Sequence, residues 1–83
     1  MNGMVREVNE IDRPTWARLT PAGSGLWRVA DERGRSLGHV RTVASQGQQR
    51  YRAEKYHGSA RSFRQLGEFW TASDAFECLR YQG

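Results

Sequence analysis

The chain has 83 residues, a formal net charge of +4, a pI near 10 and a single cysteine. This length fits one small domain, one cysteine excludes an internal disulfide, and no apolar run is long enough to span a bilayer. The N-terminal stretch carries charges where a signal peptide needs an apolar core, so we expect a cytoplasmic protein that does not bind membranes.

Residues 1–25 have weak patterning and are expected to form a partly ordered arm. Apolar residues at a spacing of three allow one or two helical turns there (Val5, Val8 and Ile11). Residues 21–25 have the composition of a loop. The segment 15–19 is apolar enough to dock on the rest of the chain and is a candidate for an extra strand (Trp16 and Leu19).

From residue 26 onward, apolar and polar residues alternate, which predicts β-strands. We expect strands over residues 26–30, 36–43 and 49–56, followed by a short extended segment over residues 63–69. Glycine-containing turns separate the first three strands, and Gly34 is expected to have a positive φ in the first turn.

The period changes near residue 71, where the sequence predicts a helix. Thr71 can cap it, with Asp74 three residues later. Four apolar residues at helical spacing form one stripe (Ala72, Ala75, Phe76 and Leu79). The expected fold is α+β, with a three-stranded antiparallel sheet, and room for an extra short strand, packed on one C-terminal helix over residues 26–83.

Strand alternation divides the expected sheet into two faces. One face is apolar and can receive the helix (Trp27, Val29, Gly38, Val40, Thr42, Tyr51, Ala53 and Leu66). The other face collects five basic residues (Arg28, His39, Arg41, Arg50 and Arg52), and Glu54 is the only carboxylate that we expect among them. Residues 26–67 carry nine basic and three acidic residues, a net charge of +6. Such unbalanced charge favours a polyanionic partner over an ordinary solvated face, which is the alternative interpretation.

The stretch LGEFWTASDAFECL, residues 66–79, resembles the end of the ethylene-response-factor type of DNA-binding domain. That family has Leu-Gly-x-Phe, a Thr-Ala-x-acid turn and then Ala at the start of its helix, which seven residues match here (Leu66, Gly67, Phe69, Thr71, Ala72, Asp74 and Ala75). Its basic cluster before the first strand has no counterpart in this chain. The arm-binding domains of tyrosine integrases share the same plan. The resemblance implies a three-stranded sheet whose exposed face enters the major groove of DNA.

We therefore predict a small non-enzymatic module that binds double-stranded DNA through Arg28, His39, Arg41, Arg50 and Arg52. The alternative is an adaptor, from a phage or an actinobacterial host, that docks on an acidic protein partner. Trp70, which precedes the expected cap, either packs on the helix near Ala75 or is exposed as an anchor for that partner.

No catalytic or metal-binding pattern is found in the sequence. His39, His57 and Cys78 are too few and too irregularly spaced for a closed zinc site. The glycines lack the spacing of a phosphate-binding loop or a dinucleotide fingerprint, and no nucleophile and base form a recognisable arrangement. We therefore expect no cofactor, no metal, no catalytic residues and no small-molecule substrate.

Overall fold

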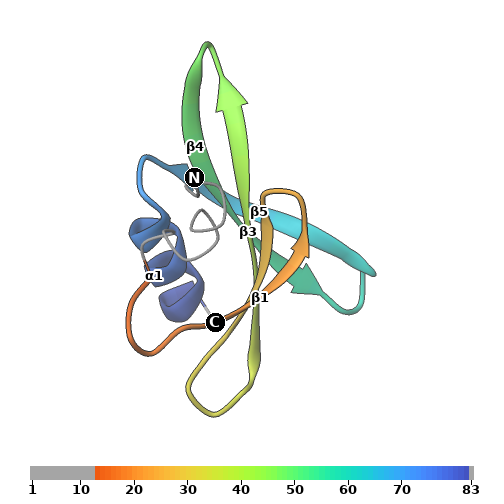
Figure 1. Cartoon of the computed structure of the whole chain (residues 1–83). Coiled ribbons are helices and arrows are strands. Elements are labelled where there is room, and N and C mark those ends of the chain that lie inside the picture. Colours follow the sequence, from red (N-terminus) through yellow and green to blue (C-terminus); the bar gives the residue numbers. More distant parts are fainter. Residues whose placement is uncertain (1–12, 83) are drawn as a thin grey trace.

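The computed structural model describes residues 13–82, which form one five-stranded antiparallel sheet and one helix (Figure 1). Neighbouring strands in the chain are neighbours in the sheet. The elements are β1 (Arg18–Gly23), β2 (Leu26–Ala30), β3 (Ser36–Ser45), β4 (Gln48–His57), β5 (Ser62–Phe69) and α1 (Ala72–Gln82). The α+β class with one C-terminal helix on an antiparallel sheet is confirmed, and the sheet is wider than expected.

The first strand lies within the segment that the sequence predicted as a partly ordered arm. β1 extends through Pro21 to Gly23, so the loop expected over residues 21–25 is limited to the turn at its end. Proline is tolerated because β1 is an edge strand, where an N–H can be lost without breaking the ladder. The expected one or two helical turns concern Val5, Val8 and Ile11, which lie outside the described residues.

The turn between β2 and β3 is organised by one carboxylate. Asp31 accepts hydrogen bonds from the backbone N–H groups of Arg33 (3.0 Å) and Arg35 (2.9 Å), and from Nε of Arg35 (3.0 Å). These bonds, led by the Arg35 backbone N–H, hold the pKa of Asp31 below its ordinary value. Gly34 has a φ of 82°, as the sequence predicted.

The core lies between the sheet and α1. Phe76 and Leu79 of α1 are fully buried, as are Val29, Val40 and Ala53 beneath them. The apolar stripe of the helix therefore packs on the apolar face of the sheet, as the sequence predicted. Thr71 caps the helix as predicted, because its Oγ1 accepts a hydrogen bond from the backbone N–H of Asp74 (3.1 Å).

Within residues 13–82, no helix combines the length and the apolar character needed to cross a membrane.

A β-bulge in β5 changes which side chains face the core. Ala53 pairs with Gly67, but the next residue of β4, Glu54, pairs with Gln65. Leu66 is therefore the extra residue, and it packs against the core. Because the bulge shifts the alternation, Glu68 lies on the same side of the sheet as its partner Arg52 instead of sharing the core side with Leu66.

Candidate nucleic-acid interface

The side of the sheet opposite α1, called the open face below, carries the basic residues that the sequence singled out. Their alternate neighbours, such as Val40 and Ala53, are buried beneath the helix. The strand register aligns two rows of polar side chains across this face, first Arg28, His39 and Glu54, and then Arg41, Arg52 and Glu68. Arg50 lies two residues before Arg52 on β4, so all five predicted residues share the open face.

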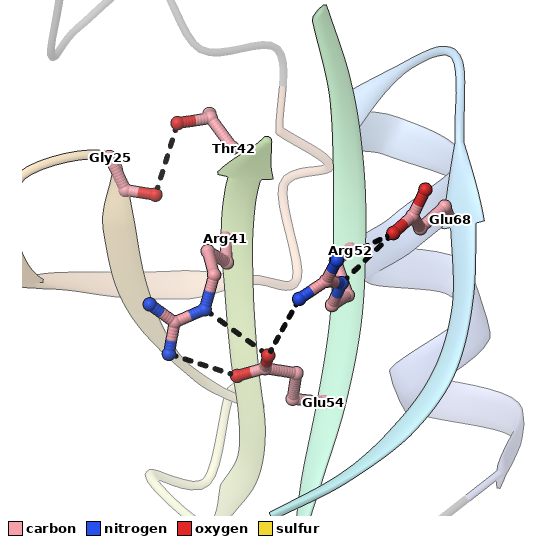
Figure 2. A network of polar contacts seen from close by, with 6 residues as sticks. All are labelled: Gly25, Arg41, Thr42, Arg52, Glu54 and Glu68. Atoms are coloured by element: carbon pink, nitrogen blue, oxygen red, sulfur yellow. Dashed lines mark hydrogen bonds and ion pairs between the residues drawn. The ribbon is translucent and has the colours of Figure 1, made fainter. Parts of the chain in front are cut away.

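Two carboxylates neutralise part of this charge (Figure 2). Nε of Arg41 donates to Oε2 of Glu54 (3.2 Å), and Nη2 of Arg41 donates to Oε1 (3.3 Å). Arg52 donates to Oε2 of Glu68 from Nε (3.0 Å) and Nη2 (2.8 Å), and its Nη1 lies 4.0 Å from Oε2 of Glu54. Arg41 and Arg52 thus form one continuous network with Glu54 and Glu68.

The expectation that Glu54 is the only carboxylate on this face is wrong, because the bulge adds Glu68. Four arginines and two glutamates lie at these positions on β2 to β5, and both glutamates are used by Arg41 and Arg52. Like charges directly opposite each other destabilise a sheet, so these glutamates stabilise the Arg41–Arg52 pairing. Among the described residues, Arg28 and Arg50 have no acidic partner, so they are the charges that a ligand meets first.

Arg50 stacks on Trp70 at one end of the open face. The guanidinium carbon lies 4.0 Å from the centroid of the indole ring, which is a cation–π contact. Trp70 is 58% exposed, which fits an available surface anchor better than a side chain packed near Ala75. Nε of Arg50 is buried without a hydrogen-bond partner among the described residues.

An aromatic cluster occupies another part of the open face. The His39 ring stacks on Phe63, with centroids 4.2 Å apart and an interplanar angle of 18°. Tyr56 meets Phe63 edge-on at 5.2 Å. Burial lowers the pKa of His39, and Arg28 and Arg41 lower it further against the opposing effect of Glu54. His39 is therefore neutral at pH 7, so it acts here as an aromatic ring and not as a cation.

Phe63 was not among the predicted site residues. Alternation counted back from Leu66 places Phe63 on the open face, because the shift of the bulge affects Gly67 and Glu68 but not residues 63–65, so this signal could have found it. Residues 13–82 contain no group of three His, Cys, Asp or Glu side chains that could hold a metal ion. Cys78 is half-buried, and this burial raises the pKa of its thiol.

No family model, curated protein or solved structure matches this chain in the comparisons. The resemblance of residues 66–79 to the ethylene-response-factor domain therefore stays a prediction.

Replacing Glu54 with glutamine is expected to weaken the fold and strengthen anion binding together. The side chain of Glu54 is about one-tenth exposed, and its loss of charge leaves Arg41 and Arg52 directly opposite each other with one counter-charge fewer. We expect the free energy of unfolding to fall by about 1–3 kcal/mol, since the arginines remain partly solvated. Urea unfolding measures this loss, and duplex DNA affinity at fixed salt measures the gain.

Glu68→Gln is the matched control, because the Glu68 side chain is more exposed at 26%. Its loss of stability is expected to be smaller. Equal stability of Glu54→Gln and the wild type would show that the network does not hold the two arginines.

Proposed function

We propose that the chain is a small, non-enzymatic DNA-binding module that places the open face of its sheet on double-stranded DNA. The observation that carries this proposal is that α1 covers one face of the sheet and leaves the other to solvent, with Arg28 and Arg50 lacking acidic partners in the described part of the chain. Guanidinium groups without an acidic partner on the face of a sheet suit phosphate contacts, since each can donate several hydrogen bonds.

Arg41 and Arg52 have a different role in this proposal. Each would have to exchange a carboxylate for a phosphate, and that exchange gains little net charge neutralisation. Arg28 and Arg50 therefore supply most of the electrostatic affinity. Each neutralised phosphate lowers log K by about 0.9 per log unit of salt, so two contacts predict a slope near −2.

The salt dependence of binding to a duplex tests this proposal. Fluorescence anisotropy with a labelled duplex between low and moderate salt would give the slope for the wild type, Arg28→Ala and Arg50→Ala. Each substitution is expected to weaken binding and to reduce the slope by about 1, because each removes one phosphate contact.

Arg33→Ala is the matched control, because Arg33 is exposed in the turn between β2 and β3, away from the rows of the open face. It removes the same charge and should leave the slope nearly unchanged. The proposal is rejected if micromolar protein does not bind at low salt, or if Arg33→Ala reduces the slope as much as Arg28→Ala.

A second candidate is the adaptor that docks on an acidic protein, and the Arg50–Trp70 pair favours it. Tryptophan and arginine dominate the binding energy of many protein interfaces, and here Arg50 stacks on Trp70, which is 58% exposed. Trp70→Ala discriminates between the candidates. The adaptor is favoured if the wild type keeps an acidic protein partner after nuclease treatment and Trp70→Ala loses that partner while it still binds the duplex.

A further inference from the structure

We infer that the part of the open face around Phe63 binds one unpaired nucleobase together with its phosphate. This inference goes beyond duplex binding and does not depend on it, because the bases of a duplex are already stacked and paired. It rests on a depression, on an aromatic cluster and on one unpaired cation that lie together.

The depression has a volume of about 430 Å³, within the usual range of about 300–1,000 Å³ for sites that take small ligands or single groups. It is too small for a duplex. The side chains that matter for its chemistry are Arg28, Leu37, His39, Lys55, Tyr56 and Phe63.

The aromatic side chains give the depression a surface for stacking. Phe63 is 42% exposed and Tyr56 is 51% exposed, although both lie in strands. His39 covers one face of the Phe63 ring, and Tyr56 contacts it edge-on, so the ring is held in place before any ligand arrives. The exposed remainder of Phe63 leaves area for a second planar ring, and stacking tolerates any base because every base has a π-face.

The positive charge in the depression favours a ligand that carries an anionic group beside its aromatic ring over a neutral aromatic ligand. Arg28 is exposed there and has no acidic partner among residues 13–82. His39 adds no charge at neutral pH, because burial and neighbouring arginines lower its pKa. A ligand that combines a flat aromatic ring with a phosphate matches both parts of the site, and a nucleotide unit has this composition.

Two single strands with equal phosphates test the inference directly. The first is a ten-nucleotide oligothymidylate, and the second is an abasic strand of the same length. We expect the wild type to bind the strand with bases about tenfold more tightly, since stacking on one aromatic platform contributes roughly a factor of ten. Fluorescence anisotropy at low salt gives both affinities.

Phe63→Ala and Phe63→Leu should bring this ratio close to one, and Leu keeps the apolar contact if Ala disturbs β5. Tyr81→Ala is the control, because Tyr81 is an aromatic residue that is 77% exposed on α1, and it should keep the ratio. Equal wild-type affinities for the two strands would overturn the inference, as would an unchanged ratio in Phe63→Leu.

Competition with thymidine monophosphate identifies the source of the base. Displacement at submillimolar concentration would assign the site to free nucleotides, whereas displacement by the strand alone would assign it to bases within a strand. Both outcomes support a base site. A tenfold ratio of the two single-strand affinities without duplex binding would support this site and reject the proposed function. Duplex binding with a ratio of one would support the proposed function and reject this site.

Discussion

Phe76→Ala is expected to lower the free energy of unfolding by about 3–5 kcal/mol. Among residues 13–82, Phe76 is the largest fully buried side chain, and it lies in the core cluster that joins α1 to the sheet. Much of the remaining core is small, since alanine fills four of its buried positions (Ala17, Ala53, Ala72 and Ala75). Small side chains cannot move to fill the cavity, so little of the loss would be recovered.

The expected loss is large for a chain of this size. At about 0.05–0.15 kcal/mol per residue, the whole domain has a stability of roughly 4–12 kcal/mol. Phe76→Ala should therefore leave a marginal or unfolded protein at 37 °C, which thermal and urea unfolding by circular dichroism would show. Phe63→Ala removes the same side chain from a position that is 42% exposed, and it should cost less than about 1 kcal/mol. Comparable losses in the two variants would contradict the assigned core.

Gly38→Ala is expected to destabilise the domain by about 3 kcal/mol or more. Gly38 lies inside β3 with a φ of 149°, which side chains of L-residues rarely adopt. An added Cβ would overlap the backbone carbonyl oxygen of Glu54 and lie 3.0 Å from Cδ2 of Leu79. The carbonyl belongs to the central β3–β4 ladder, so it cannot move aside without disturbing the pairing of His39 with Glu54.

Gly34→Ala separates the two causes of this loss. Gly34 also has a positive φ, of 82°, but an added Cβ would meet nothing within 4 Å. Its cost is therefore limited to the backbone, about 1–2 kcal/mol. If urea unfolding gives both variants the same loss, the close approach between β3 and β4 at Gly38 is not as the structure describes.

Most of the architecture could be predicted because alternation and helical spacing are local signals. The strand over residues 26–30 has the expected bounds, and β3, β4 and β5 extend the expected segments by one or two residues at their ends. β1 was missed in part, because Pro21 and Gly23 are typical of loops and only the free edge of a sheet tolerates them. That edge position depends on the whole sheet, which no local pattern encodes.

The site was harder to predict than the fold. Alternation placed the five basic residues on one face, because β2, β3 and β4 keep their register over those positions. It could not place Glu68, since the extra residue of the bulge at Leu66 is not visible in the pattern. Phe63 was missed although alternation counted back from Leu66 places it on the open face. The contact between Arg50 and Trp70 joins residues far apart in the chain, so it too required the structure.

Residue-resolved NMR during titration with duplex DNA tests the central claim, that the open face is the binding surface, most directly. Backbone amide signals of Arg28 and Arg50 and of their neighbours on β2 and β4 are expected to shift at low salt and to return as salt is added. Signals of Glu77 and Tyr81 on α1, which covers the other face of the sheet, should stay in place. Shifts confined to α1, or no shifts at any protein signal, would contradict this claim.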